Sequence, residues 1–230
     1  MRLAIIVPVL DEAAQIEPCL AALAELRQRG VQVIVADGGS RDQTVRLAAP
    51  LCDRVVSAAR GRSLQMNAGA RSEQARAADV LLFLHVDARL PADADRLVFR
   101  ALGNSRARWG RFDVKLQGRS IGLGLIATMM NLRSRATGIC TGDQAIFVEQ
   151  GTFLALEGFA PIGLMEDVEF CRRARQLSWP VAVRPPLTAS ARRWDQAGLW
   201  RTVLLMWWLR LAYFLGADPQ TLAQRYRNAR

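Results

Sequence analysis

The sequence predicts an α/β fold in which a mostly parallel central sheet carries helices on both faces and is followed by a C-terminal helical extension. Three apolar runs, residues 3–9, 31–36 and 81–84, each have the length and composition of a strand that is buried on both faces. Segments with helical spacing of apolar residues separate these runs, and such β-α alternation is typical of parallel sheets. The 230 residues suit one domain with an appendage.

The remaining elements follow from periodicity and turn signals. Further strands are expected near residues 54–57 and at 109–116, 145–148 and 181–184. Helices are expected at residues 12–29, from the turn at 37–42 to Ala48, from a Ser63 cap to about Ala77, after Pro91 through Leu102, and at 118–136, 166–177, 194–215 and 219–226.

Composition and charge limit the classes of function. The net charge of +10 favours anionic partners such as nucleic acid, acidic lipid headgroups or a phosphorylated substrate. The four cysteines form no C-x-x-C pair, which argues against a zinc knuckle or a disulfide framework and fits a reducing cytosol. The N-terminus does not resemble a signal peptide, and no apolar stretch is long enough to span a membrane. We therefore expect a cytoplasmic protein.

Acidic residues follow the ends of the three apolar runs. Asp11 and Glu12 follow the first run, Asp37 ends the second and Asp87 follows the third. A parallel sheet brings these ends to one edge, where ligands of open α/β sheets bind. Carboxylates gathered in one cleft repel each other unless a cation or a donor-rich ligand compensates. A divalent metal with a nucleotide would do both, whereas each acidic residue taken singly would be an ordinary helix or turn cap.

Positive charge is expected at the same edge. Arg60 and Arg62 precede a predicted helix N-terminus, a combination that favours anion binding, and a solvated loop with a Ser63 cap is the alternative interpretation. The sequence has neither a G-x-x-x-x-G-K-[ST] phosphate loop nor a G-x-G-x-x-G motif after the first strand. A dinucleotide-binding fold of the Rossmann type is therefore weakly supported.

Taken in order, these motifs resemble the family-2 glycosyltransferases of the GT-A fold over residues 1–195. The resemblance rests on IVPVLDE at residues 6–12, VADGGSRD at 35–42, the segment 62–69, HVD at 85–87 and Glu166-Asp167. With GDQAIFV at 142–148 and the Trp-rich tail, the HVD segment resembles the subgroup of radical-SAM/selenodomain-associated transferases. Residues 196–230 would then be a helical extension, packed on the transferase domain or at a membrane surface.

The resemblance implies an inverting transfer of a sugar from a nucleotide diphosphate sugar, most often a UDP-sugar, to an acceptor hydroxyl with the help of Mn²⁺ or Mg²⁺. Asp167 would be the general base, and Asp87 would hold the metal. Glu166 would help to position the acceptor or remain a helix-cap charge, and Asp143 would face the acceptor or be a turn residue. The residues expected to bind the nucleotide sugar are Pro8, Asp11, Glu12, Asp37, Arg62, His85, Asp87, Asp143 and Arg193.

The sequence departs from the family pattern in two places. His85 stands where the family's D-x-D motif has its first Asp, and a histidine can hydrogen-bond to ribose or phosphate or ligate a transition metal. Arg192-Arg193-Trp194 only partly resembles the Q/R-x-x-R-W motif of processive polysaccharide synthases. Arg193 would still bind a diphosphate, but processive synthesis is not supported.

The tail between Trp200 and Leu215 combines aromatic residues with Arg201 and Arg210. A helix of this composition would make peripheral contact with a membrane, cover the hydrophobic side of the domain or form the contact of a homodimer.

Two other classes of function stay open. A non-catalytic module that binds a nucleotide or nucleic acid would suit the charge, but the sequence has no basic stripe interleaved with aromatics, so no nucleic-acid partner is expected. A nucleotidyltransferase would have a glycine-rich phosphate loop near the first strand, which residues 8–14 lack.

Overall fold

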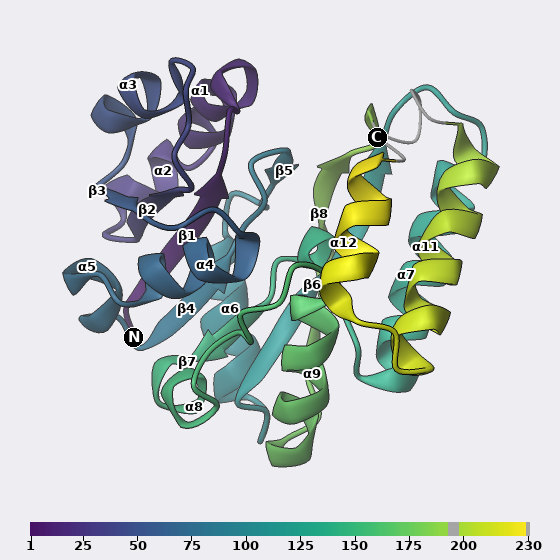
Figure 1. The fold of residues 1–230 in the computed structure, drawn as a ribbon. Coiled ribbons are helices and arrows are strands. Elements are labelled where there is room, and N and C mark those ends of the chain that lie inside the picture. The colour runs from purple at the N-terminus through teal and green to yellow at the C-terminus, as the bar shows by residue number, and fades with distance from the viewer. Residues whose placement is uncertain (193–197, 229–230) are drawn as a thin grey trace.

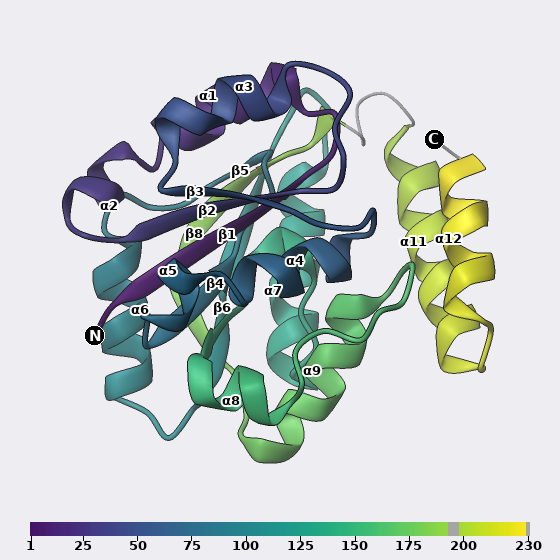
Figure 2. The same cartoon turned by 60° about the vertical axis from the view of Figure 1, so that its left-hand side comes forward.

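The computed structural model describes residues 1–192 and 198–228 of the 230-residue chain. It confirms the predicted α/β class, because helices cover both faces of a mostly parallel sheet (Figures 1 and 2). In the described part of the chain the sheet has eight strands in the order β3-β2-β1-β4-β7-β6-β8-β5. Their bounds are β1 (Leu3–Val9), β2 (Gln32–Asp37), β3 (Arg54–Ser57), β4 (Val80–Phe83), β5 (Ala88–Arg89), β6 (Trp109–Gln117), β7 (Phe147–Glu149) and β8 (Val181–Ser190).

The helices form two layers around this sheet. Figure 2 shows α1, α2 and α3 on one side and α4, α5 and α9 on the other. The α-helices are α1 (Ala13–Ala21), α2 (Ala24–Gln28), α3 (Thr44–Ala48), α4 (Arg62–Ala70), α5 (Glu73–Arg76), α6 (Ala94–Gly103), α7 (Leu123–Thr137), α8 (Gln150–Ala155), α9 (Glu166–Leu177), α11 (Leu199–Phe214) and α12 (Pro219–Asn228). Two short 3-10 helices, η1 (Ala49–Leu51) and η2 (Gly142–Gln144), complete the set in the described residues.

The first four strands form the parallel half of the sheet. β1 pairs with β2 and β4, and β2 pairs with β3, all in parallel. Successive side chains of β1 point to opposite faces, so Leu3, Ile5 and Val7 join one apolar cluster while Ala4 and Ile6 join the other. Burial on both faces explains why this strand appears in the sequence as a continuous apolar run.

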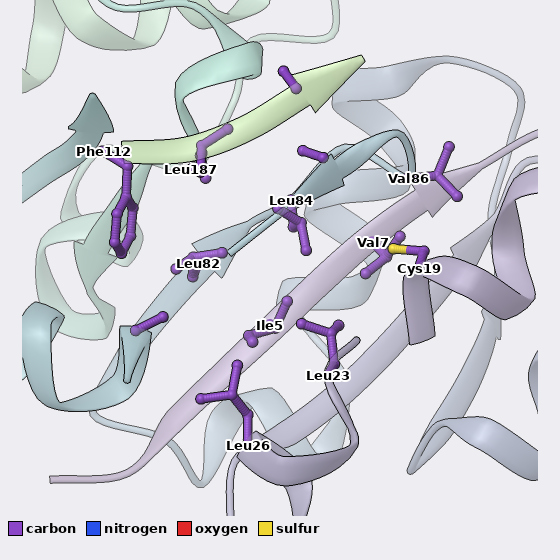
Figure 3. Packing of buried hydrophobic residues seen from close by; sticks show 14 of the residues in the cluster. Ile5, Val7, Cys19, Leu23, Leu26, Leu82, Leu84, Val86, Phe112 and Leu187 are labelled. Atoms are coloured by element: carbon purple, nitrogen blue, oxygen red, sulfur yellow. The ribbon is translucent and has the colours of Figure 1, made fainter. Parts of the chain in front are cut away.

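Each face of the sheet carries its own apolar core. Figure 3 shows the first core, with Val7 of β1 beside Cys19 of α1 and with Ile5 near Leu23. Residues of α3, α6 and α7 complete that cluster, whereas α4, α5, α8 and α9 contribute to the second. Full burial of one such aliphatic side chain contributes about 1.5–3 kcal/mol, so these two clusters supply most of the driving force for folding.

The second half of the sheet breaks the β-α alternation. β7 runs antiparallel to both β4 and β6, and β6 then pairs in parallel with β8. β8 continues to Ser190, beyond the predicted end at Arg184, and its last residues pair with the unpredicted strand β5. A hydrogen bond from Ser190 N–H to the carbonyl oxygen of Asp87 (3.0 Å) adds to this pairing. The chain around Asp87 is therefore fixed against β8.

Two predicted helices are divided, and one predicted cap is wrong. The expected helix at residues 12–29 is α1 and α2, because Leu23 N–H bonds to Leu20 three residues back and tightens the chain there. The helix expected to end near Ala77 is α4 and α5. Gly61, with φ 144°, precedes α4 as its N-cap, whereas Ser63 is buried and its Oγ donates to the carbonyl oxygen of Ile162 (3.4 Å).

A buried polar network fixes α7 to β6. Arg111 is fully buried and pairs with Asp113, which also pairs with Arg135 of α7. Asn131 of α7 exchanges two hydrogen bonds with the backbone of β6, at 2.9 and 3.0 Å. Gln144, in the turn before β7, donates to Asn131 Oδ1 (3.3 Å). The network thus reaches the turn that carries Asp143.

The C-terminal helices α11 and α12 lie side by side (Figures 1 and 2). Leu209 of α11 and Leu222 of α12 are buried in the second core. The opposite face of α11 leaves Leu204, Trp207 and Leu211 exposed to solvent. Within the described residues, no helix combines the length and the hydropathy needed to cross a bilayer.

Candidate active site

Two adjoining cavities lie at the carboxyl end of β1. The first has a volume of about 190 Å³ and the second about 340 Å³, and both are lined by Pro8, Glu12, Arg62 and Glu166. The structure therefore brings eight of the predicted site residues to one place, since the first cavity is lined by Pro8, Glu12, Arg62, His85, Asp87, Asp143, Glu166 and Asp167.

Asp11 follows β1 and Asp37 ends β2, and hydrogen bonds connect the two segments that begin there. Neither residue lines these cavities. The Asp37 carboxylate accepts hydrogen bonds from Ser40 Oγ (2.5 Å) and Ser40 N–H (3.1 Å). Asp11 accepts from Arg41 N–H (2.7 Å), and its own N–H donates to Ser40 Oγ (2.9 Å). Both acidic residues therefore stabilise the turn that presents Glu12, and binding of the nucleotide sugar by Asp11 and Asp37 stays a prediction. Arg193 lies outside the described residues.

His85 lines the first cavity, and neighbouring residues fix the orientation of its ring. Its Nδ1 lies 3.2 Å from Asp143 Oδ1, and its buried Nε2 has no hydrogen-bond partner among the described residues. The ring lies so close to Gly142 that a Cβ there would stand 2.3 Å from Nε2. Gly142 therefore leaves the space that the imidazole fills, and Asp143 orients the ring.

Asp167 is fixed at the N-terminus of α9, where the sequence predicts it. Its Oδ2 accepts a hydrogen bond from Gly142 N–H (2.8 Å), and its Oδ1 accepts from Val168 N–H (2.7 Å). The helix N-terminus also favours a negative charge at this position. The carboxylate thus has a defined orientation without losing its contact with the first cavity.

Glu166 is the more enclosed of the two carboxylates. Its side chain is 6% exposed, and Oε1 lies 3.7 Å from Arg62 Nη1. Burial raises the pKa of Glu166, the charge of Asp167 adds to this effect, and Arg62 opposes it. Burial lowers the pKa of Arg62, but the carboxylates around it, Glu166 and Asp143 above all, raise it beyond its ordinary value. Arg62 is therefore the counter-charge of the acidic cavity.

Replacement of Glu166 with Gln is expected to change how stability depends on pH. Because the pKa of Glu166 is raised in the folded protein, the folded state binds the proton more tightly, so wild-type stability falls as pH rises from the unfolded pKa to the folded one. Glu166→Gln lacks this titration and should gain in stability relative to wild type as pH rises. Melting temperatures measured over this pH interval test the shift.

Glu169→Gln is the matched control, because Glu169 lies on the same helix in a part-exposed pair with Arg173 (2.6 Å). The difference in melting temperature between Glu169→Gln and wild type should not shift in favour of Glu169→Gln as pH rises. A Glu166→Gln variant whose difference from wild type stayed constant across the interval would contradict the proton-binding argument.

Strained backbone surrounds the cavity. Asp11 (φ 54°) precedes Glu12, Ala145 (φ 46°) follows the turn that carries Asp143, and Met165 (φ 68°) precedes Glu166. A non-glycine residue in this region costs about 1–3 kcal/mol and persists only where the surrounding structure over-determines it. Such residues are concentrated at functional sites, which agrees with the gathering of charged residues here.

The sequence matches glycosyl transferase family 2 over residues 4–147, more than half of the chain. The chain belongs to glycosyl transferase family 2. This confirms the family that the motifs predict, whereas the resemblance to the radical-SAM/selenodomain-associated subgroup stays a prediction. A search among curated proteins gave no match.

Solved structures with the same fold include TarS and a glucosyl-3-phosphoglycerate synthase. S. aureus TarS 1-349 in complex with UDP-GlcNAc aligns with a TM-score of 0.64 at 16% identity, over 84% of this chain and 59% of the TarS chain. Glucosyl-3-phosphoglycerate synthase from Mycobacterium tuberculosis, in complex with Mn²⁺, UDP and phosphoglyceric acid, aligns with a TM-score of 0.64 at 18% identity, over 94% of this chain and 79% of that chain. At these identities the likeness shows the shared fold, and this family-2 chain spans less than two thirds of TarS 1-349.

The side chains of the first cavity fit a metal ion that is coordinated mainly by a bound nucleotide. Asp87 lines the first cavity, but the described residues contain no group of three or more His, Cys, Asp and Glu side chains arranged to hold an ion. Nucleotide-bound Mg²⁺ typically takes one or two carboxylates, and phosphate oxygens and waters complete its shell. A single carboxylate at Asp87 is compatible with that mode of binding.

The second half of the chain supplies cavity residues that sequence reasoning missed. The additional polar residues that line the first cavity are Thr141, Ser190, Arg192, Thr202, Arg210 and Tyr226. Three of them lie on α11 and α12, so these two helices form part of the cavity wall. One signal was present in the sequence, because Arg210 is the charge that interrupts the apolar stretch at residues 203–216.

Proposed function

We propose that the protein is an inverting glycosyltransferase that moves a sugar from a nucleotide diphosphate sugar, a UDP-sugar by preference, to an acceptor hydroxyl. The observation that carries this proposal is the first cavity, in which an oriented carboxylate, Asp167, shares the lining with Asp87 and Arg62 in a family-2 chain. The UDP and UDP-GlcNAc bound by the TarS structures support the choice of donor, as does the UDP of the glucosyl-3-phosphoglycerate synthase.

Asp167 is the proposed general base. An acceptor hydroxyl is a weak nucleophile, and a positioned carboxylate must take its proton while the new carbon–oxygen bond forms. In the same step the bond between the anomeric carbon and the phosphate oxygen breaks, and the nucleoside diphosphate leaves with the electron pair. Attack from the opposite face inverts the anomeric centre. Glu166 is less suited to this role because its carboxyl is enclosed and faces Arg62.

Basic and polar side chains of the second cavity can match the negative charge of the donor. Arg60, Arg62 and Gln65 line the second cavity, which we assign to the nucleoside diphosphate. A divalent metal held by Asp87 would stabilise the charge of the departing diphosphate. Arg62 lines both cavities and would contact the phosphates where the two meet.

We further propose that residues 1–195 form the transferase domain and that residues 196–230 are an extension that completes its site. Thr202, Arg210 and Tyr226 support this division, because all three belong to the extension and line the first cavity. The extension would then be required for transfer rather than for stability alone.

Titration calorimetry of the purified protein with UDP, GDP and ADP, each with and without Mn²⁺, tests the donor site. We expect one diphosphate to bind, more tightly with Mn²⁺, and Asp87→Ala to abolish the gain from Mn²⁺ while the metal-free affinity stays. Absence of binding to all three diphosphates would contradict the proposal. Pyrophosphate as the product, in place of a nucleoside diphosphate, would instead identify a nucleotidyltransferase.

The exposed face of α11 and α7 is proposed to contact the anionic inner surface of a membrane. On α11 the side chains of Leu204 (68% exposed), Trp207 (60%) and Leu211 (58%) face solvent, and α7 adds Leu125 (62%) and Leu132 (58%). Aromatic and aliphatic side chains on such a face suit the headgroup boundary, and the net charge of +10 complements acidic lipid.

Co-sedimentation with phosphatidylcholine vesicles, with and without phosphatidylglycerol, tests this contact. We expect binding to the anionic vesicles only, and loss of binding in the double variant Trp207→Ser, Leu211→Ser. Leu154→Ser is the control, because Leu154 is 63% exposed but lies on α8. A wild-type dimer in solution that the double variant disrupts, without vesicle binding, would instead make this face a contact between two copies.

A further inference from the structure

One face of α11 forms part of the cavity wall. Thr202, Met206 and Arg210 follow each other at intervals of four residues, so they lie on one side of the helix, and all three line the first cavity. Arg210 is the charged member of this row. The helix therefore delivers a single guanidinium to a cavity whose other lining residues include Asp143 and Asp167.

Within the part of the chain that the structure describes, Arg210 has no direct partner. Among the described residues it makes no hydrogen bond and no ion pair, although Asp167 and Asp143 are close enough to act on it electrostatically. Burial lowers the pKa of Arg210, and these two carboxylates oppose the effect. The guanidinium thus carries its charge into the cavity with its donors unused.

A second guanidinium, on α7, acts electrostatically on Arg210. Burial lowers the pKa of Arg133, on α7, to about 10, and the charge of Arg210 contributes to this shift. Arg133 Nη2 is buried and has no hydrogen-bond partner within the part of the chain that the structure describes. Two cations with unused donors that act on each other repel, and an anion bound at Arg210 would reduce this cost.

We infer that Arg210 forms a subsite for a phosphate or carboxylate group of the acceptor. A guanidinium binds either anion through paired hydrogen bonds, and the positive charge of Arg133 adds to the attraction. This inference rests on the proposed function and adds to it the chemical class of the acceptor, which would be an anionic molecule with a free hydroxyl.

The position of Arg210 favours the acceptor over the donor. Arg210 lines the first cavity and is absent from the lining of the second, where Arg60 and Arg62 provide charge for a diphosphate. The carboxylates that act on Arg210 are Asp167, the proposed base, and Asp143. An anionic group held by Arg210 would therefore place the rest of its molecule near the group that removes the hydroxyl proton.

The test is a calorimetric titration of inorganic phosphate into the full-length protein, once without nucleotide and once with saturating UDP. We expect phosphate to bind in both conditions and Arg210→Gln to weaken it by about tenfold or more, since charge-assisted hydrogen bonds are lost. Arg210→Lys keeps the charge and should weaken phosphate by about threefold. Arg201→Gln is the control, because Arg201 is exposed on the opposite side of α11 and its loss should change the affinity by less than about twofold.

Several outcomes overturn the inference. It fails when wild type does not bind phosphate, when Arg210→Gln binds phosphate as tightly as a folded Arg201→Gln protein, or when Arg210→Gln loses UDP affinity by the same factor as phosphate affinity. The last result would make Arg210 a ligand of the donor. Phosphate binding that depends on Arg210 in a protein that binds no nucleoside diphosphate would leave the subsite standing and remove the proposed donor site, so the two failures are distinguishable.

Discussion

Asp167→Asn is expected to lower the rate of sugar transfer by about 10²–10⁴-fold, the usual contribution of a general base. The amide has no basic oxygen at neutral pH, but it can still accept the hydrogen bond that Asp167 Oδ2 accepts from Gly142 N–H (2.8 Å). The backbone around the site should therefore stay in place, and the loss should fall on kcat. Steady-state rates of nucleoside diphosphate release in the presence of acceptor measure it.

Asp143→Asn is the matched control for this prediction. Asp143 lines the same cavity, and its carboxylate lies 3.2 Å from His85 Nδ1, so its loss should affect the orientation of the imidazole more than proton removal. Both variants should keep the wild-type affinity for the nucleoside diphosphate within about twofold. A larger loss of kcat in Asp143→Asn than in Asp167→Asn would move the role of base to Asp143.

Asp113→Asn is expected to reduce the free energy of unfolding by about 3–5 kcal/mol, the cost of breaking a buried ion pair from one side. The Asp113 carboxylate pairs with Arg111, whose side chain is 2% exposed, and with Arg135 of α7. Loss of the negative charge leaves the Arg111 guanidinium buried without a counter-charge. Urea denaturation followed by circular dichroism measures the change.

Glu149→Gln provides the comparison for a surface pair. Glu149 pairs with Arg108 at 3.0 Å, but the Arg108 side chain is 62% exposed, so the loss should be below about 1 kcal/mol. Equal losses in the two variants would show that burial does not set the strength of the Arg111–Asp113 pair. Asp113→Asn should also lower activity, since the same network reaches Gln144 beside Asp143.

The parallel half of the fold was predictable because its strands are buried on both faces. Residues 3–9 match β1, and the predicted strands at 31–36 and 81–84 each lie within a residue of β2 and β4 at their N-terminal ends. β5 was not predictable, because two residues carry no periodicity and their pairing with β8 depends on tertiary contacts. The antiparallel direction of β7 was not predictable for the same reason, because the local residue pattern does not depend on the direction in which a strand pairs.

The acidic side of the site was predictable, and its basic side was not. Asp87, Glu166 and Asp167 follow apolar runs or open a helix, so sequence position alone points to one edge of the sheet. Arg210 comes to the same cavity from a helix that begins more than a hundred residues after Asp87, and only the packing of α11 on the domain decides which of its faces turns inward.

The position of α11 between the cavity and solvent sets the distance between the outer surface of this helix and the proposed site of reaction. Thr202 and Arg210 line the cavity from one side of the helix, while Leu204 and Leu211 face outward from the other. One helix with its side chains is about 10 Å across. When the outward face rests on a surface, the proposed reaction takes place at about that height above it. The enzyme would then select acceptors by how far their hydroxyl group projects, independently of which sugar or ring carries it.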